Sequence, residues 1–515
     1  MVSMAQSNAA SKISVTCDEP AGYNCPVICR WGSVMRIGQT SLVYFVSKVI
    51  GSALGFVATI YFARALGAEI LGQYALVMAL ITWLGIGGTV GFSGAISKRI
   101  SEGEDPDRFA GAGLVVMGST MTAVAAFVVL FREQVNAYVG APVAAFVVLL
   151  LFVTLFKSFV SASLKGSHLV HVYAVLSTGR QATRAATQIA LVAVGFGLAG
   201  MLFGYATGYL LTATVGLWIL GVRPALPEKH HIVSLFAYAK YAWLGKVRGR
   251  TFDTLDIAVL GLFVGQGLIG IYSVAWAIGK FLDIFGSAVS STLFPEMSSV
   301  SANDGPRAVA GLTEDALTYA GLILIPGLVG TVIVGDRLLR MYGETFVAGT
   351  EILSVLVVAL LVYTYNKQLL NTLNAIDRPD LAFRANGVFI ATNVTLNVVL
   401  IPLYGWIGAA VATALSAAVG LLVAFQFTRQ HVPFAVPTAA IVRQWLAAGG
   451  MGLVVFAGRR VEESYQLLQH NLILVSLLVS LGAVSYFLTL FLIAPGFRTT
   501  VRRNLPVEGA LDRPG

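Results

Sequence analysis

Charged residues are scarce in this chain. Asp, Glu, Lys and Arg make up only 11% of its 515 residues, whereas about a quarter is usual in a soluble domain. Hydrophobic residues make up 57%, and 54 residues are glycine, which lets helices approach closely inside a bilayer. This balance excludes an ordinary soluble protein and indicates a membrane protein.

Cysteines and catalytic motifs are also few. Cys17, Cys25 and Cys29 precede the first apolar run without the spacing of a zinc site, so we predict free thiols. The sequence contains no G-x4-G-K-[ST], H-E-x-x-H or G-x-S-x-G, the motifs of P-loop ATPases, zinc proteases and serine hydrolases. We therefore predict that the protein is not an enzyme and that it uses no cofactor or metal.

The hydrophobic residues gather in long runs. A helix that crosses a bilayer needs about 20 apolar residues, and fourteen runs reach or approach this length. We therefore predict an all-α, polytopic membrane protein. The runs 171–195 and 243–264 begin with polar and charged residues, which is typical of helices that line a cavity. The fourteen runs are 38–62, 70–92, 109–131, 142–163, 171–195, 198–220, 243–264, 267–291, 316–335, 351–372, 382–402, 406–427, 438–457 and 471–494.

The positive residues set the predicted orientation. The net charge is +9, which would suit a nucleic-acid partner in a soluble protein. In a membrane protein Lys and Arg concentrate in cytoplasmic loops. If both termini are cytoplasmic, the inner loops and tails hold 25 Lys and Arg residues and the outer loops hold 6. We predict a multi-pass protein of the cell membrane with both termini inside and no nucleic-acid partner.

Two motifs recur at one offset. K-V-x-G at 48–51 returns at 246–249, and G-x4-G-x-Y at 67–74 returns at 265–272, each 198 residues later. The shared offset indicates an internal duplication, although chance in a chain rich in glycine and valine is the alternative. Six spans separate the copies, so both copies cross the membrane in the same direction and the repeat is parallel.

The duplication divides the chain into segments. We predict that the two lobes superpose by a rotation about the membrane normal, matching Gly67 to Gly265 and Tyr74 to Tyr272. The predicted segments are a disordered cytoplasmic tail (1–37), an N-terminal lobe of six helices (38–220), a cytoplasmic linker (221–242), a C-terminal lobe of six helices (243–430), an added helix pair (431–497) and a cytoplasmic tail (498–515).

Basic residues in or near the spans are candidates for binding an anion. Arg180 and Arg184 share one face of the run 171–195, with no acidic residue within four positions. Their planar guanidinium groups suit phosphate, and the alternative is a longer cytoplasmic loop with solvated arginines. Lys48, Lys246 and Lys367 fall near predicted cytoplasmic ends of spans. They either ring a cavity mouth that attracts an anionic lipid headgroup or extend to the headgroups of the bilayer.

Acidic residues occur inside the runs 243–264 and 267–291. Asp253 and Asp256 share a helix face, and Arg250 lies one turn before Asp253. Either Arg250 and an aspartate form a buried ion pair that locks the packing of the lobe, or the acidic residues form a proton or cation site or a gate. We predict that Asp256 faces the space between the lobes with a polar or cationic neighbour. Lys280 and Asp283 are predicted to neutralise each other.

Two further pairs have a simpler interpretation. His230 and His231 lie in the predicted linker and have metal-binding chemistry, but a solvated polar loop is favoured. Asn393 and Asn397 lie one turn apart in the run 382–402 and are predicted to bond between helices rather than to hold a sugar.

Four motifs carry a family resemblance. Residues 61–74 (YFARALGAEILGQY) and 256–272 resemble hairpins of the polysaccharide-export flippases, and L-F-P-E at 293–296 and residues 400–410 match further signatures. In this order the motifs resemble the Wzx-like branch of the multidrug/oligosaccharidyl-lipid/polysaccharide superfamily over about residues 38–430. The stretch 285–296 looks most like archaeal members, which serve protein N-glycosylation and the S-layer.

The resemblance implies a transport function. The expected cargo is an oligosaccharide on a polyprenyl (dolichol or undecaprenyl) phosphate or pyrophosphate, moved by alternating access from the cytoplasmic to the outer leaflet. It would serve cell-surface glycan assembly or S-layer N-glycosylation. The expected partners are this cargo and membrane lipids. The protein is expected to be a monomer that associates with glycan-assembly enzymes.

Two other functions remain open at this stage. One is an ion-coupled multidrug antiporter of the same fold, in which Asp253 and Asp256 would bind the coupling ion and the cargo would be cationic. The other is a membrane polymerase or ligase of lipid-linked sugars, which the short outer loops disfavour. The excess of basic residues in the spans favours the flippase.

Overall fold

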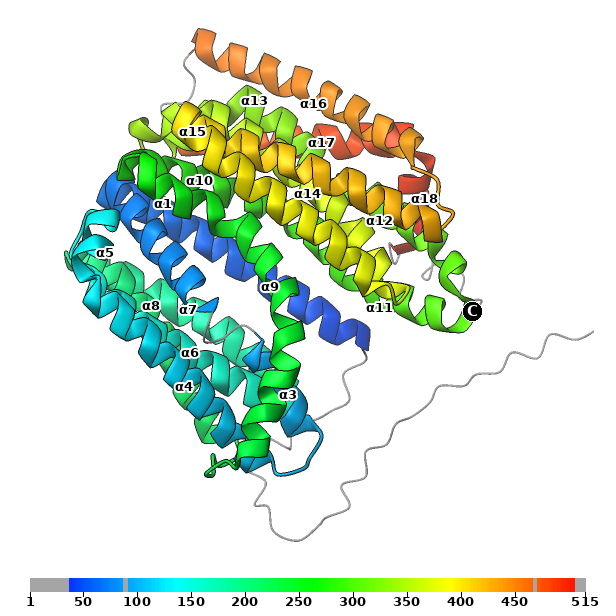
Figure 1. Ribbon diagram of the computed structural model, residues 1–515. Coiled ribbons are helices and arrows are strands. Elements are labelled where there is room, and N and C mark those ends of the chain that lie inside the picture. The colour runs from blue at the N-terminus through cyan, green and yellow to red at the C-terminus, as the bar shows by residue number, and fades with distance from the viewer. Residues whose placement is uncertain (1–36, 87–90, 466–469, 505–515) are drawn as a thin grey trace, which may run out of the picture. The chain divides into compact units, whose positions relative to one another are not determined.

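Helices account for all the regular structure in the part of the chain that is described (Figure 1). The structure, a computed structural model, describes residues 37–86, 91–465 and 470–504, with side chains from residue 54 onward except those of 171, 240–248 and 500–504. The chain divides into two units between Tyr44 and Phe45. The three cysteines lie outside the described residues. The all-α prediction is confirmed.

The N-terminal lobe contains helices that match its six predicted runs. In it α7 packs on α8, and α6 contacts α3, α4 and α8. The first described element, α1, contains a break at Gly67, whose φ of 77° only glycine adopts easily. The helices are α1 (Ile37–Leu84), α3 (Phe92–Ser101), α4 (Pro106–Leu130), α5 (Arg132–Val139), α6 (Ala144–Gly166), α7 (Val170–Ala193) and α8 (Gly197–Ile219).

The remaining helices follow from Lys229 onward. In this part α14 packs on α10, α11, α13 and α15. The helix α15 is broken at Gly405, with φ 58°, and Asn393 donates to Ser416 across the break, so its two halves lie side by side. The elements are α9 (Lys229–Phe263), α10 (Gln266–Leu282), α11 (Ile284–Asp304), η2 (Pro306–Val309), α12 (Ala310–Ala320), α13 (Leu324–Arg340), η3 (Glu344–Gly349), α14 (Thr350–Ala375), α15 (Pro379–His431), α16 (Thr438–Tyr465), α17 (Asn471–Ile493) and α18 (Pro495–Asn504).

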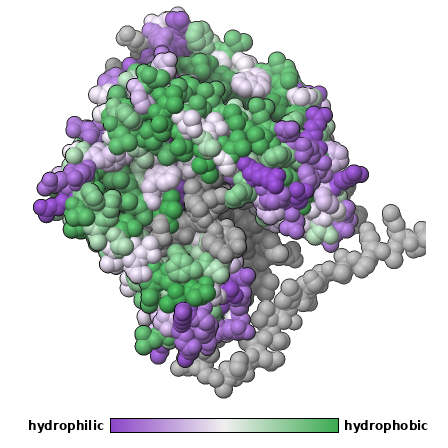
Figure 2. Space-filling model, viewed as in Figure 1, coloured by the Kyte–Doolittle hydropathy of each residue, from purple (hydrophilic) through white to green (hydrophobic). Residues whose placement is uncertain are grey.

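The helices are long and apolar enough for a membrane. Among the described residues nine helices pass this test, or ten if α10 and α11, bent by 45°, form one broken span. Each of the fourteen predicted runs overlaps a helix, and α1 and α15 each overlap two runs. The membrane fold is confirmed, while the count of fourteen stays a prediction. Figure 2 shows a broad hydrophobic surface with hydrophilic residues gathered toward its edges.

The helices α7 and α9 are not among those nine. They correspond to the two runs that the sequence marks as polar. They carry Arg180 and Arg184 on α7, and Arg250, Asp253 and Asp256 on α9. The residues that make these helices poor lipid-facing spans are therefore the candidate site residues.

The helix α9 contacts helices of both predicted lobes. It begins at Lys229, inside the predicted linker 221–242, because Glu228 and His231 form a capping box at its start. Its first part packs against α3 and α4, and its second part packs against α15. His231 is fully buried in this cap, so the solvated loop predicted for it is wrong. Within the described residues no group of His, Cys, Asp and Glu is arranged to hold a metal ion.

The two copies of the G-x4-G-x-Y motif meet each other. A Cβ on Gly72 would lie 1.8 Å from the carbonyl oxygen of Gln266, and a Cβ on Gly270 would lie 1.8 Å from that of Ala68. Positions 68 and 266 are 198 apart, as are 72 and 270. The contact is therefore reciprocal, as expected between repeats related by a two-fold axis. It supports the duplication, and only glycine fits at either crossing point.

The helices α16 and α17 pack on α13. Arg459 of α16 donates to both oxygens of Asp336 on α13, at 2.8 and 3.1 Å, and to Glu463 at 2.8 Å. A bidentate pair of this kind fixes orientation as well as contact. The added helix pair is therefore attached to the C-terminal lobe by a defined ionic contact.

Candidate functional site

Arg184 is held by groups that do not neutralise its charge. Its Nη2 donates to the Tyr74 hydroxyl at 2.8 Å, and its Nε donates to Gln188 Oε1 at 3.3 Å. Its guanidinium also lies over the Tyr205 ring, 4.8 Å from the ring centroid. An aromatic face attracts a cation without carrying a net negative charge. Arg184 thus keeps its full positive charge inside the helix bundle.

Arg180 has a similar environment one turn away. Its guanidinium lies 4.7 Å from the centroid of the Tyr209 ring. Its Nε is buried and has no acceptor among the described residues. The rings of Tyr205 and Tyr209 stack on each other at 4.2 Å. Arg180 therefore has unused hydrogen-bonding capacity directed into a protein interior.

A third cation joins this group from α6. Lys157 lies 6.0 Å from the centroid of the Tyr209 ring. We call Lys157, Arg180, Arg184, Tyr205 and Tyr209 the basic–aromatic cluster. Within the part of the chain that the structure describes, none of its three cations forms an ion pair with a carboxylate. Uncompensated charge at membrane depth is tolerated where it faces water or an anion, so the cluster is a candidate anion site.

The three predicted lysines are not brought into this cluster by the described contacts. The side chains of Lys48 and Lys246 lie outside the described residues. Lys367, on α14, donates to the Ser287 hydroxyl of α11 at 2.9 Å. It therefore contacts the interior of the C-terminal lobe.

Asp256 occupies a polar pocket within the C-terminal lobe. The residue is 4% exposed, and its carboxylate accepts hydrogen bonds from Tyr272 at 2.7 Å, Asn397 at 2.9 Å and Thr413. The predicted polar neighbours are present. The predicted position between the lobes is wrong, because all three donors lie on α10 and the two halves of α15, against which this part of α9 packs.

Further oxygen atoms lie near the Asp256 carboxylate. Asn397 donates to Asp256 through its side-chain amide. The side-chain Oδ1 atoms of Asn397 and Asn393 are buried and have no hydrogen-bond partner among the described residues. The two asparagines also bond between helix segments, to Asp256 and to Ser416, as predicted. Carboxylate and amide oxygens suit a proton or a hard cation. The pocket is therefore a candidate site for a proton or a hard cation.

The predicted ion pairs around Asp253 do not form. Asp253 pairs with Lys280 of α10 at 2.5 Å, whereas Arg250 donates to the Thr82 carbonyl oxygen at 3.1 Å. Asp283 accepts from Ser287 at 2.9 Å and from Thr364. The predicted pairing of Lys280 with Asp283 is wrong, and the alternative in which Arg250 pairs with Asp253 is not the one observed. Each group meets a closer partner on a neighbouring helix or at the bend after α10.

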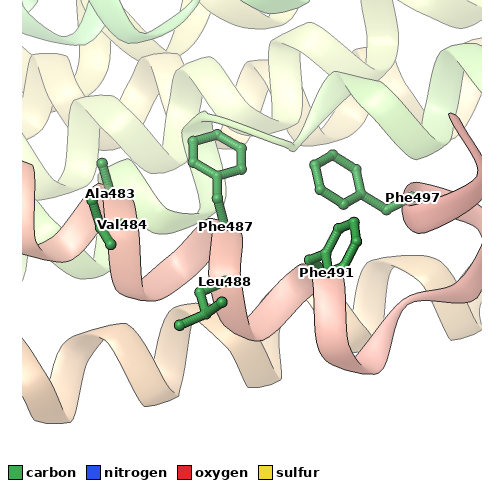
Figure 3. A pocket seen from close by; sticks show the side chains of 6 residues that line it. All are labelled: Ala483, Val484, Phe487, Leu488, Phe491 and Phe497. Atoms are coloured by element: carbon green, nitrogen blue, oxygen red, sulfur yellow. The ribbon is translucent and has the colours of Figure 1, made fainter. Parts of the chain in front are cut away.

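An apolar pocket of about 550 Å³ lies between α17 and α18 (Figure 3). Its lining side chains are all hydrocarbon or aromatic, so it offers no group that could recognise a phosphate or a sugar. It shares no residue with the basic–aromatic cluster. The residues that line it are Ala483, Val484, Phe487, Leu488, Phe491 and Phe497.

Comparison with known families gives two matches. The family described as "Polysaccharide biosynthesis protein" matches residues 37–301. The family described as "Lipid II flippase MurJ" matches residues 255–482. The first match covers half of the chain, including the basic–aromatic cluster, and the second covers most of the C-terminal lobe and the added helix pair.

Individual relatives agree with these matches. The chain is 31% identical to the "Probable flippase AglR" of Haloferax volcanii, over 91% of this chain and 98% of that one. It is 28% identical to the "Probable low-salt glycan biosynthesis flippase Agl15" of the same organism, over 75% of this chain and 82% of that one. The solved structure "Lipid II flippase MurJ, inward closed conformation" has the same fold, with a TM-score of 0.75 at 16% identity, over 89% of this chain and all of that one. The chain therefore belongs to the polysaccharide biosynthesis protein family, as one of its Wzx-type membrane flippases.

Proposed function

We propose that this protein moves a polyprenyl phosphate- or pyrophosphate-linked oligosaccharide from the cytoplasmic to the outer leaflet of the cell membrane. The observation that carries the proposal is the basic–aromatic cluster, with three cations and no carboxylate partner among the described residues. A lipid-linked phosphate supplies the missing anion, and its apolar tail remains in the bilayer. The orientation, with both termini cytoplasmic, and a monomeric state are part of the proposal.

The process that uses the transported glycan is proposed from the names of the relatives. One of them is named for glycan biosynthesis, and the cargo phosphate is the chemistry that the cluster recognises. We therefore propose cell-surface glycan assembly or S-layer protein N-glycosylation as the process that uses the cargo. Lys48 and Lys246 are proposed to contact headgroups at the cytoplasmic mouth, and Lys367 is proposed to act with them in another conformation.

The ion-coupling role is proposed for Asp256. Its buried carboxylate and the neighbouring amide oxygens would take up a proton or a monovalent cation and so link its movement to that of the cargo. Asp253 and Arg250, which contact Lys280 and Thr82, are proposed as gating residues. An antiporter of cationic drugs would use the same pocket, but the basic–aromatic cluster would repel its cargo.

Reconstitution of the purified protein tests the function. Vesicles carry a fluorescent polyprenyl diphosphate-linked oligosaccharide in both leaflets, and a membrane-impermeant quencher reports how fast the inner pool becomes accessible. We expect transfer that depends on the protein and that is accelerated by a gradient of protons or sodium ions. Protein-containing vesicles that transfer no more cargo than empty vesicles would contradict the proposal.

Asp256→Asn in the same vesicles tests the coupling. Asparagine has the shape of aspartate but cannot carry the charge, so we expect transfer to continue at the rate seen without a gradient and to lose its acceleration. The control is Asp304→Asn, which changes an exposed carboxylate on α11. Full acceleration in Asp256→Asn would remove this residue from the coupling site.

A further inference from the structure

One tyrosine of the duplicated motif contacts a candidate site residue in each lobe. Tyr74 and Tyr272 close the two copies of G-x4-G-x-Y, 198 residues apart. Tyr74 contacts Arg184 and Tyr272 contacts Asp256. The same position of the repeat therefore meets a cation in one lobe and an anion in the other.

In the N-terminal lobe the phenol oxygen acts as an acceptor. Tyr74 Oη accepts from Arg184 Nη2 at 2.8 Å and from Gln188 Nε2 at 3.2 Å. Gln188 is itself fixed, because its Nε2 also donates to the Met201 carbonyl oxygen at 2.7 Å. These bonds set the direction of the Arg184 guanidinium. The Tyr74 O–H proton remains available for an anion that Arg184 binds.

In the C-terminal lobe the same group acts as a donor. Tyr272 is 1% exposed, and its Oη donates to Asp256 Oδ2 at 2.7 Å. A carboxylate can only accept, so the phenol proton must lie on this bond. Thr413 donates to the same oxygen, and Asn397 donates to the other. Tyr272 is thus one of the groups that orient the buried Asp256 carboxylate.

The charged partners differ between the lobes although the tyrosine is the same. The position 198 residues before Asp256 is Ala58, which carries no charge. The reciprocal contact of Gly72 and Gly270 shows that the two motif copies occupy equivalent places. A phenol hydroxyl both donates and accepts, so one residue type can orient either sign of charge.

We propose that Tyr74 and Tyr272 are positioning residues with opposite tasks. Tyr74 directs the Arg184 guanidinium toward the phosphate of the cargo, and Tyr272 directs the Asp256 carboxylate toward the coupling ion. The inference rests on the proposed function, since it assigns the cargo to one lobe and the coupling ion to the other. It assigns a specific step to each copy of the duplicated hairpin.

The test compares Tyr74→Phe with Tyr272→Phe in the purified full-length protein. Phenylalanine keeps the ring and removes only the hydroxyl. Binding of geranylgeranyl diphosphate is measured by calorimetry, and the concentrations of sodium ions and protons that half-saturate transfer are measured in vesicles. We expect Tyr74→Phe to weaken diphosphate binding by about tenfold, the loss typical of a hydrogen bond to a charged group, and to leave the ion dependence unchanged. Tyr272→Phe should shift the ion dependence by about tenfold and leave diphosphate binding unchanged.

The control is Tyr486→Phe. Tyr486 is buried in α17, and its hydroxyl has no hydrogen-bond partner among the described residues, so neither quantity should change. If both site variants altered both quantities equally, or if neither altered any, the assignment of tasks would be overturned. Arg184→Ala in the same calorimetry distinguishes a failure of the positioning role of Tyr74 from a failure of the proposed cargo site. Lost binding there with normal binding in Tyr74→Phe overturns only the positioning role, whereas normal binding in Arg184→Ala contradicts the proposed cargo site.

Discussion

Replacing Arg184 with alanine is expected to abolish glycan delivery while leaving the amount of protein in the membrane normal. The cargo phosphate would lose a fork of donors, and each hydrogen bond to a charged group contributes about 1.5–3 kcal/mol. The stacked tyrosines and Arg180 remain, so the fold should tolerate the change. Surface glycan is measured in a deletion strain that carries each variant, with protein abundance measured by immunoblot.

Two comparisons make this result specific. Arg184→Lys should restore delivery only partly, because lysine is a point charge rather than a planar fork. Arg223→Ala, an exposed arginine before α9, should deliver glycan normally. Resistance to cationic drugs should not change in any of these strains. Normal delivery by Arg184→Ala would remove this residue from the site, and lost drug resistance with intact glycan would favour the antiporter.

Replacing Gly270 with alanine is expected to stop transport by a different route. The added methyl would lie 1.8 Å from the Ala68 carbonyl oxygen, so the two hairpins cannot close on each other at the predicted outer side. We expect the outer side to remain open in this variant and in Gly72→Ala. The measurement is the reactivity of a cysteine at Gln73, the residue after Gly72, toward a membrane-impermeant thiol reagent.

A neighbouring glycine provides the control for this variant. A Cβ on Gly267 would meet nothing within 4 Å, so Gly267→Ala should transport and label like the parent. Both variants are made after replacement of the three native cysteines. Normal transport by Gly270→Ala with unchanged labelling would show that the glycine contact does not close the pathway.

The sequence was sufficient to predict the membrane helices because the hydrophobic residues that define each span extend over the whole helix. Each apolar run overlaps a helix, and the two runs with charged starts correspond to α7 and α9, which are not among the nine candidate spans. The offset of 198 predicted a relation that the reciprocal contact of Gly72 and Gly270 supports. Arg180 and Arg184 were identifiable because they share a helix face without acidic neighbours in sequence.

The partners of charged residues were not predictable in the same way. Sequence spacing favoured Arg250 for Asp253, but the partner is Lys280, which α10 brings alongside α9. Thr413 lies in an apolar run with no special spacing, although it donates to Asp256. Tertiary packing decides such contacts. The start of α9 was not predictable for a related reason, since the capping box of Glu228 and His231 begins this helix before its apolar run.

The leaflet distribution of the lipid-linked oligosaccharide in cells lacking the protein tests most directly whether this protein transfers that lipid between leaflets. Spheroplasts of the deletion strain are treated with a membrane-impermeant reagent that labels the glycan, before and after permeabilisation. We predict that lipid-linked oligosaccharide accumulates and is labelled only after permeabilisation, and that the intact gene restores labelling from outside. Accumulated lipid-linked oligosaccharide that is labelled on intact spheroplasts of the deletion strain would contradict the account.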